Sequence, residues 1–290
     1  MPKNKRKLLS IIIPTYKRQK ALLMCLNRLK STYQNINGNC YELIISDDDY
    51  SRQTRTKVVA RYKSSKVMIK YITGPQKGPA ANRNNGAKSA VGDWLIFLDD
   101  DCLPSKNLIK NYLEIIKTKP DVQAIEGKIK SIGLKPSLDA YSPVNYEGGK
   151  FLSCNIAIKK TLFQEIRGFS ELFPFAAMED IELKTRLDKR NIPILFTKEA
   201  SVSHPWRCLN ASKFIKENEA SLQIYLKLHP DQKQFYRPSK FLWTFFKNWF
   251  NIIKQVLKGK GKGLLNASKI NIFYLKLAFS FIFLKITSKN

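Results

Sequence analysis

The sequence is poor in residues that form disulfides or zinc sites. Its five cysteines are scattered through 290 residues, are odd in number and never form a Cys-x-x-Cys pair. This pattern excludes a disulfide framework and a zinc ribbon, and it favours a reducing compartment such as the cytoplasm. Glycine and proline are also scarce, at 13 residues each, and no internal repeat is present. A collagen-like chain and a solenoid are therefore excluded.

Long apolar runs are missing as well. The first apolar stretch, residues 8–13, is shorter than the core of a signal peptide and has no small-residue cleavage site after it. A late stretch, residues 270–284, contains Lys276 and falls short of the ~20 apolar residues that span a bilayer. We therefore expect neither an export signal nor a spanning helix.

Acidic residues are few. The chain has 23 Asp and Glu against 51 Lys and Arg, a formal net charge of +28, which indicates a polyanionic partner such as nucleic acid, an anionic membrane or a phosphorylated substrate. From residue 213 onward, three acidic residues face fifteen basic ones. Hydrophobic residues still make up 43% of the chain, so we expect it to fold as one large domain or as a catalytic domain with an appendage.

Apolar runs alternate with helical patterns in the first hundred residues. Short runs at 8–13, 41–46, 67–72 and 93–98 predict buried strands, and the segments between them predict helices at 20–29, 53–62 and 79–90. This order is typical of an α/β fold with a doubly wound, mostly parallel, Rossmann-like sheet. Further strands are expected at 123–129, 152–158 and 192–203, a helix at 178–190, and a loop at 131–150.

Charged residues follow three of the predicted strands. Residues 14–18 form a basic turn, and the acidic triplets 47–49 and 99–101 follow later strands. Ligands of such sheets bind beyond the carboxyl ends of the strands, so these residues are expected at one crevice. Adjacent carboxylates at 99–101 favour a hard divalent cation, Mg²⁺ or Mn²⁺, although a solvated acidic turn is an alternative.

These motifs, in this order, resemble those of the family 2 glycosyltransferases of GT-A fold. The resemblance covers roughly residues 8–207. Residues 10–18 are similar to the family's first strand and nucleotide-binding turn, and 45–51 to its second-strand aspartate motif. Residues 78–86 resemble the basic helix start, and 97–101 the Asp-x-Asp motif. Residues 153–157 resemble the acceptor-side segment, 178–183 the Glu-Asp motif, and 202–207 the late His motif.

The resemblance implies an inverting, metal-dependent enzyme that transfers a hexosyl or N-acetylhexosaminyl group. The donor would be a nucleotide-diphosphate sugar, with a UDP-sugar favoured, and the acceptor a glycan or a lipid-linked sugar. Asp180 would be the general base, with Glu179 setting its environment. Donor binding is expected of Pro14, Thr15, Tyr16, Arg18, Asp47, Arg83, Asp99 and Asp100, metal binding of Asp99, Asp101 and His204, and acceptor contact of Asn155 and Trp206.

Several of these residues have a plain structural alternative. Asp180 would also be favoured in the first turn of a helix by the helix dipole alone. His204 would serve equally as a structural histidine, Arg83 as an ion-pair partner of the acidic triplet, and Trp206 as a packing residue. At the level of the whole protein, a nucleotidyltransferase and a basic nucleic-acid-binding protein are the two alternatives, of which the second leaves the acidic clusters unexplained.

The end of the chain has a different character. Lys240, Lys247 and Lys254 recur at a spacing of seven residues and share one helical face with Thr244, Asn248 and Asn251. The remaining residues of this segment are aromatic and aliphatic and form a broad apolar face. We therefore expect a catalytic domain at 1–209, with a nucleotide-binding half at 1–101 and an acceptor half at 102–209, and a helical, amphipathic region at 210–290. Residues 240–290 would bind the anionic inner face of the cell membrane, with no nucleic-acid partner; packing on the catalytic domain or dimerisation is the alternative.

Overall fold

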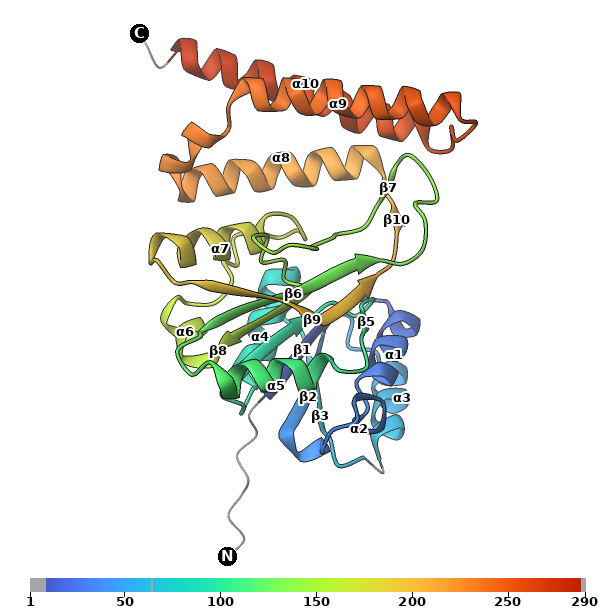
Figure 1. Cartoon of the computed structure of the whole chain (residues 1–290), viewed down its shortest axis with the longest axis vertical. Coiled ribbons are helices and arrows are strands. Elements are labelled where there is room, and N and C mark those ends of the chain that lie inside the picture. Colours follow the sequence, from blue (N-terminus) through green and yellow to red (C-terminus); the bar gives the residue numbers. More distant parts are fainter. Residues whose placement is uncertain (1–8, 64, 288–290) are drawn as a thin grey trace, which may run out of the picture. The chain divides into compact units, whose positions relative to one another are not determined.

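The computed structural model describes residues 9–63 and 65–287, with side chains up to residue 282 (Figure 1). Residue 8 of the expected first strand and residues 288–290 of the expected C-terminal region lie outside this range. The chain divides into two compact units. The N-terminal unit contains the chain up to Ile132 together with Pro143–Pro205, and the C-terminal unit contains Gly133–Ser142 together with the chain from Trp206 onward.

An eight-stranded sheet organises the N-terminal unit, in the order β3-β2-β1-β4-β8-β6-β9-β5. Its first half is parallel, as the alternating sequence pattern predicts. This half consists of β1 (Leu9–Thr15), β2 (Tyr41–Asp47), β3 (Met68–Thr73) and β4 (Trp94–Leu98). Thr15 at the end of β1 pairs with Asp47 at the end of β2, so their following turns emerge side by side.

The second half of the sheet is mixed. β8 (Asn155–Lys159) runs antiparallel to β4 and to β6 (Ala124–Ser131). β9 (Ile194–His204) runs parallel to β6, and the two-residue β5 (Leu103–Pro104) is antiparallel to β9. The α/β prediction is confirmed, and the antiparallel strands β8 and β5 make the sheet mixed.

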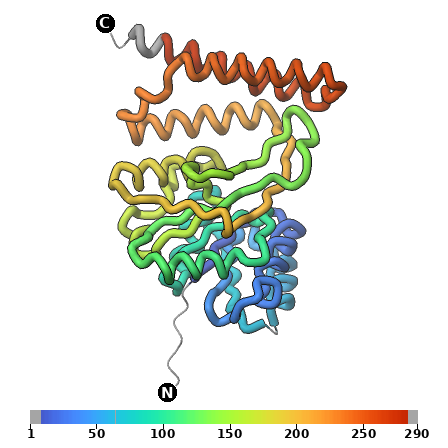
Figure 2. Tube along the Cα trace, viewed as in Figure 1, coloured from blue at the N-terminus to red at the C-terminus, as the bar shows by residue number. Residues whose placement is uncertain are grey.

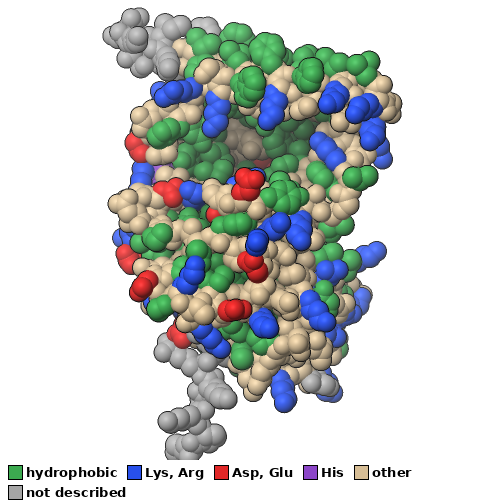
Figure 3. Space-filling model, in the orientation of Figure 1, with side chains coloured by type: hydrophobic (Ala, Val, Ile, Leu, Met, Phe, Trp, Pro, Cys, Tyr) green, Lys and Arg blue, Asp and Glu red, His purple; other side chains and the backbone are tan. Residues whose placement is uncertain are grey.

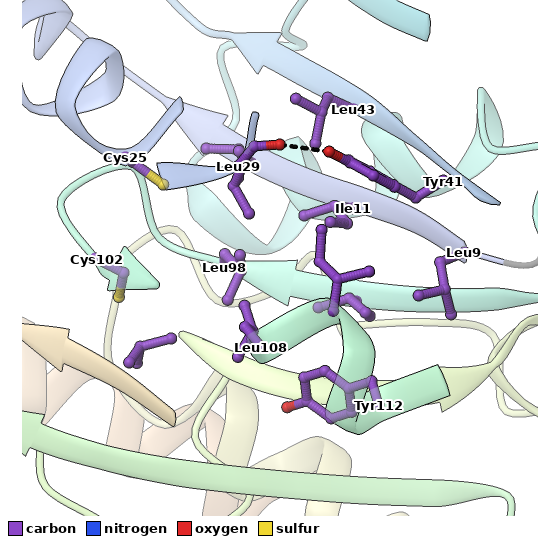
Figure 4. Packing of buried hydrophobic residues seen from close by; sticks show 14 of the residues in the cluster. Leu9, Ile11, Cys25, Leu29, Tyr41, Leu43, Leu98, Cys102, Leu108 and Tyr112 are labelled. Carbon is purple, nitrogen blue, oxygen red and sulfur yellow. Dashed lines mark hydrogen bonds between the residues drawn. The ribbon is translucent and has the colours of Figure 1, made fainter. Parts of the chain in front are cut away.

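Helices cover both faces of this sheet (Figure 1). One face packs on α1 (Gln19–Arg28), α3 (Arg52–Tyr62) and α5 (Leu108–Thr118), with the short α2 (Ser31–Gln34) and 3₁₀ helix η1 (Gly38–Cys40) at its rim. The other packs on α4 (Pro79–Lys88), α6 (Lys160–Glu165) and α7 (Glu179–Lys189). Ile11 faces the first set and Ile12 the second, which explains why β1 is apolar at consecutive positions. In the first core, the Tyr41 hydroxyl donates a 2.6 Å hydrogen bond to the Leu29 carbonyl (Figure 4).

A glycine fixes the start of α4. Gly78 has a φ of +92°, and a Cβ at this position would lie 2.3 Å from the carbonyl oxygen of Pro174. Only glycine accommodates both the positive φ and this close approach. The start of α4 is therefore held against the segment that leads into α7.

The C-terminal unit is mainly helical. It contains α8 (Ala211–Leu228), the 3₁₀ helix η2 (Pro230–Phe235), α9 (Pro238–Leu257) and α10 (Leu264–Thr287), and α9 and α10 run side by side (Figure 2). α9 confirms the helix expected around the recurring lysines. Among the described residues, no helix has the length and hydrophobicity that a membrane span requires.

Part of the expected 131–150 loop packs within the C-terminal unit. Residues Ala140–Tyr141 (β7) pair with Arg207–Cys208 (β10), and the Leu138 amide donates to the Lys262 carbonyl at 2.8 Å. Asn266 on α10 donates to the Asp139 carboxylate at 3.0 Å. The units therefore divide after Pro205 and around this insertion, which differs from the expected boundary at residue 209 because these contacts join segments far apart in sequence.

Candidate active site

The carboxyl ends of β1 and β2 border a pocket of about 250 Å³. Three of the predicted donor-binding residues, Thr15, Arg18 and Asp47, line it. The pocket also has a group of polar lining residues that we did not predict as site residues: Lys17, Gln19, Asp49, Ser51, Gln53 and Thr54. Lys17 belongs to the basic turn 14–18 and Asp49 to the acidic triplet 47–49, which the sequence places at strand ends. Gln19, Gln53 and Thr54 belong to α1 and α3, whose approach only the fold reveals.

Asp47 shapes the turn after β2. Its Oδ1 accepts a hydrogen bond from the Asp49 amide at 3.0 Å, and its Oδ2 accepts one from the Ser51 amide at 3.2 Å and one from the Tyr71 hydroxyl. Asp47 as a whole residue is 2% exposed. Asp47 thus organises the pocket wall, and Tyr71 is a partner that sequence reasoning missed.

Asp100 is a buried residue that supports its neighbours, and the expected donor contact of Asp100 stays a prediction. It is fully buried, accepts a 2.6 Å hydrogen bond from the Thr15 hydroxyl, and pairs with the Arg18 guanidinium at 2.7 Å. Burial raises the pKa of Asp100 to about 7, although the Arg18 charge opposes this shift. Asp100 therefore holds Arg18 at the pocket, where 40% of the Arg18 side chain is exposed.

Arg83 joins the acidic turn after β4 to the start of α7. Its guanidinium lies 2.8 Å from Asp99 Oδ1 and 2.9 Å from Glu179 Oε1, and its side chain is 3% exposed. Burial disfavours the cation, but the charges of Asp99 and Glu179 outweigh burial and raise the pKa of Arg83 above its ordinary value. Two guanidinium nitrogens are engaged on protein carboxylates, so Arg83 forms a buried bridge, as its ion-pair alternative expects; donor binding by Arg83 stays a prediction.

Asp180 lies at the first turn of α7, next to this bridge. Met178, just before it, has a φ of +68°, an uncommon conformation for a non-glycine residue. Asp180 Oδ1 accepts from the Ile181 amide at 2.8 Å, and Oδ2 from the Ser153 amide at 3.4 Å. Burial raises the pKa of Asp180 above its ordinary value, although the Arg83 charge opposes this, and a raised pKa suits a proton acceptor near neutral pH.

Asp101 and His204 present a donor set for a divalent cation. His204 Nδ1 lies 2.9 Å from the Pro205 carbonyl, and because a carbonyl only accepts, Nδ1 donates. In the neutral ring, Nε2 is then an acceptor, and it faces Asp101 Oδ1 at 3.3 Å. With the ring in this neutral form, the facing oxygen and nitrogen fit a shared cation, and a backbone bond from the second ring nitrogen is usual for metal-binding histidines.

Cys102 lies close enough to join this donor set, since its Sγ, Asp101 and His204 offer atoms within 4.8 Å of one another. The interaction with Cys154 and burial raise the pKa of the Cys102 thiol well above its ordinary value. A protonated thiol is a poor ligand. The fit is therefore to the carboxylate and imidazole groups, with Asp99 two residues from Asp101 on the same turn.

Three other predicted residues have different positions. Asn155 is fully buried; its amide nitrogen donates to the carbonyls of Lys128 and Ala200, both at 3.0 Å, and its oxygen accepts from Tyr112. Asn155 thus ties strands together, and its expected acceptor contact stays a prediction. Pro14 is buried inside β1, whereas Tyr16, within the basic turn, is 54% exposed, and donor binding by both residues stays a prediction. Trp206 belongs to the C-terminal unit and donates to the Gly133 carbonyl at 3.3 Å.

Comparison with known proteins gives consistent results. The family model described as Glycosyl transferase family 2 matches residues 10–165. An uncharacterized glycosyltransferase of Haemophilus influenzae is 31% identical over 219 residues, which covers 68% of this chain and 71% of the relative. The Escherichia coli UDP-Glc:alpha-D-GlcNAc-diphosphoundecaprenol beta-1,3-glucosyltransferase WfgD is 30% identical over 190 residues, 63% of this chain and 71% of that protein.

A solved structure shares the fold. The mannosyltransferase PcManGT from Pyrobaculum calidifontis, in complex with GDP-Man and Mn²⁺, superposes with a TM-score of 0.54 at 14% identity, over 99% of this chain and 77% of its own. The expected GT-A fold is confirmed.

The Arg83 bridge generates a stability prediction. In Arg83→Met, Glu179 and Asp99 lose their shared counter-charge, and we expect the free energy of unfolding to fall by about 3–5 kcal/mol, as for other broken buried pairs. Urea denaturation at neutral pH measures this. The matched control is Arg190→Met, which breaks the 2.6 Å pair with Glu165 on the surface and should cost no more than about 1 kcal/mol. Equal losses in the two variants would contradict the bridge.

Proposed function

Because the chain belongs to glycosyl transferase family 2, we propose that it transfers a sugar from a nucleotide-diphosphate donor to a hydroxyl group of a glycan or lipid-linked acceptor, with inversion at the anomeric carbon. The observation that carries this proposal is the Asp99–Arg83–Glu179 bridge. It ties the acidic turn after β4 to the helix start that bears Asp180. Leaving-group stabilisation and proton removal would thus have separate, rigidly connected residues.

The donor is proposed to be a UDP-sugar with a hexosyl or N-acetylhexosaminyl group. The name of the relative WfgD specifies UDP-Glc. The pocket beyond β1 and β2 offers Thr15, Arg18 and Asp47 to the nucleotide, with Tyr16 exposed next to them. These contacts lie away from the reacting bond, so their binding energy would hold the donor in place for transfer.

A divalent cation, Mn²⁺ or Mg²⁺, is proposed at Asp99, Asp101 and His204. PcManGT, which shares the fold, was solved with Mn²⁺. When bound, such an ion supplies a Lewis acid that stabilises negative charge on the departing diphosphate. Asp101 and His204 would hold it by the facing oxygen and nitrogen described above, and Asp99 by the same short turn.

Asp180 is proposed to accept the proton of the acceptor hydroxyl. Its side chain is partly exposed, whereas Glu179 beside it is buried and engaged by Arg83. Glu179 would therefore set the position of the helix start rather than meet the substrate. Attack by the hydroxyl from the face opposite the leaving group inverts the anomeric centre.

Membrane association of the C-terminal unit is proposed from the exposed face of α9. Trp243, Phe246 and Phe250 are 71%, 61% and 68% exposed, whereas Ile252 on the opposite side of the helix is buried. Lys247 and Lys254 are exposed on the face next to the aromatic residues. Figure 3 shows hydrophobic and basic side chains together over α9 and α10. Aromatic side chains flanked by lysines are typical of helices that lie in an anionic membrane interface.

A membrane position suits a lipid-linked acceptor. The name of WfgD specifies a diphosphoundecaprenol acceptor. If this chain uses an acceptor of that class at the inner face of the cell membrane, attachment through α9 keeps enzyme and acceptor on the same surface and raises their effective concentration.

Asp180→Asn should abolish transfer and spare donor binding. The amide is isosteric but cannot accept the proton, so we expect kcat to fall at least ~100-fold. The dissociation constant for UDP-glucose or UDP-GlcNAc, measured by calorimetry with Mn²⁺, should stay within about twofold. Asp188→Asn on the exposed side of the same helix, where the carboxylate pairs with Lys184 at 2.7 Å, is the matched control and should keep full activity.

Wild-type pH dependence provides a second readout of Asp180. The base acts when deprotonated, so kcat/KM should fall as pH is lowered through the pKa of Asp180. Since burial raises that pKa, the loss should begin at a higher pH than for an ordinary aspartate. Normal turnover by Asp180→Asn would remove Asp180 from the mechanism.

Asp101→Ala should lose metal-dependent nucleotide binding. Removing the carboxylate that faces His204 takes away one ligand, so the stimulation of UDP binding by Mn²⁺ should fall at least ~10-fold. Calorimetric titration of UDP with and without Mn²⁺ measures this, with the exposed Asp121→Ala as control. Retention of the full Mn²⁺ effect would place the cation elsewhere.

Membrane binding should depend on the exposed face of α9. Cosedimentation with vesicles of phosphatidylglycerol and phosphatidylcholine should be strong for the whole chain and weaker at high salt, since each lysine near the surface contributes about 1 kcal/mol. Replacing Trp243, Phe246 and Phe250 together by Ser should lower the affinity at least ~10-fold.

The control for this experiment replaces three exposed apolar residues of the N-terminal unit, Met24, Met68 and Val91, together by Ser. This variant should bind vesicles as the wild type does. Equal binding by both triple variants, or wild-type binding that is insensitive to phosphatidylglycerol, would contradict the proposed surface.

A further inference from the structure

Glu126 is an acidic residue in the interior of the sheet. It lies on β6, is 2% exposed, and sits within a segment that the sequence predicts as a buried strand. Its carboxylate is satisfied by one loop, residues 145–151. The side-chain amide of Asn145 donates at 2.9 Å, and the amides of Lys150 and Phe151 at 3.0 and 2.7 Å. The Gly149 amide donates as well. Three consecutive backbone donors thus converge on one side chain.

The loop held by Glu126 has an unusual backbone. Gly148 and Gly149 have φ values of +88° and +83°, and Phe151 has a φ of +49°. Phe151 is not a glycine, so its positive φ is costly and persists only where surrounding contacts enforce it. The contacts here are the Glu126 carboxylate and the burial of the Phe151 ring, which is fully enclosed in the core.

The opposite end of the loop is anchored by Asn145. Its backbone exchanges two hydrogen bonds with Ile129 of β6, at 2.9 and 3.0 Å, and its side-chain oxygen accepts from the Gly148 amide at 3.0 Å. The loop is therefore tied to β6 at both ends, at Ile129 and at Glu126. Without the Glu126 carboxylate, the backbone amides of residues 149–151 would have no charged acceptor to hold them together.

The same loop leads directly to the proposed base. Two residues after Phe151, the Ser153 amide donates to Asp180 Oδ2 at 3.4 Å. The position of this donor depends on the path of the chain through residues 149–151. Glu126 does not contact Asp180. However, only one residue, Leu152, separates Ser153 from Phe151, whose amide donates to Glu126.

We propose that Glu126 is a positioning residue for the base side of the active site. It holds residues 145–151 in one conformation and thereby keeps the Ser153 amide on Asp180. This inference rests on the proposed function of Asp180. It assigns a role to an acidic residue outside all the motifs that suggested the enzyme.

The test uses Glu126→Gln in the whole chain. Glutamine keeps the shape but replaces one acceptor oxygen with a donor, so at least one amide of the loop meets another donor. We expect trypsin to cut after the exposed Lys150 at least ~10-fold faster than in the wild type. Hydrolysis of UDP-glucose or UDP-GlcNAc with Mn²⁺ should fall at least ~10-fold in kcat, with the donor dissociation constant within about twofold.

Glu147→Gln is the matched control, because Glu147 is an exposed acid in the same loop. It should behave as the wild type in both assays. If Glu126→Gln fails to fold, Asn145→Ala removes one donor and leaves the three amide bonds to Glu126, and it should show smaller changes in the same direction.

The outcomes separate the two proposals. Unchanged cleavage after Lys150 in Glu126→Gln, or faster cleavage there with hydrolysis within twofold of the wild type, would overturn the positioning role. Accelerated cleavage at many sites, together with a lower kcat, would indicate general destabilisation and would also overturn it. A wild-type protein that neither binds nor hydrolyses nucleotide sugars would instead refute the proposed function, and the cleavage assay would still report on the loop.

Discussion

A single buried guanidinium, that of Arg83, stands between two acidic groups contributed by distant parts of the chain. Asp99 follows β4, Glu179 begins α7, and both lie within hydrogen-bond distance of Arg83. Two carboxylates that share one counter-charge would repel each other without it, and this repulsion would favour their protonated forms. The bridge allows the acidic turn and the helix start to approach, and it places Asp180 next to both. The relation between the two sides of the active site therefore depends on this ion pair.

Two other buried acids of the N-terminal unit, Asp100 and Glu126, also have hydrogen-bond donors or a counter-charge around their carboxylates. Asp100 is held by Thr15 and Arg18, and Glu126 by the amides of its loop. Each buried carboxylate thus has defined donors, as burial of charge requires. Asp101 pairs with Arg18 through Oδ2 at 2.9 Å, while its Oδ1 faces His204 Nε2 at 3.3 Å, and these two atoms are the ones that the proposed cation would bind.

The C-terminal unit shows how one helix can have two apolar sides with different uses. Ile252 of α9 is buried within the unit, while Trp243, Phe246 and Phe250 point to solvent. The broad apolar face visible in the sequence therefore separates into a packing side and an exposed side. The exposed residues suit the membrane-binding hypothesis, and the buried residue suits the packing alternative. One helix can have both faces, because its 3.6-residue period places residues on every side of the axis.

By itself, the sequence determined the parallel half of the sheet, the helix α9 and the acidic triplets at strand ends. These depend on apolar runs and periodicities within short segments, which are local properties. Only the tertiary structure decided that Asp100 and Arg83 are buried supports, that Asn155 ties strands together, that residues 133–142 join the C-terminal unit, and that Glu126 organises a loop. Each of these roles is set by partners far away along the chain. Local patterns carry no record of such partners, because burial and pairing arise only when separate segments pack together.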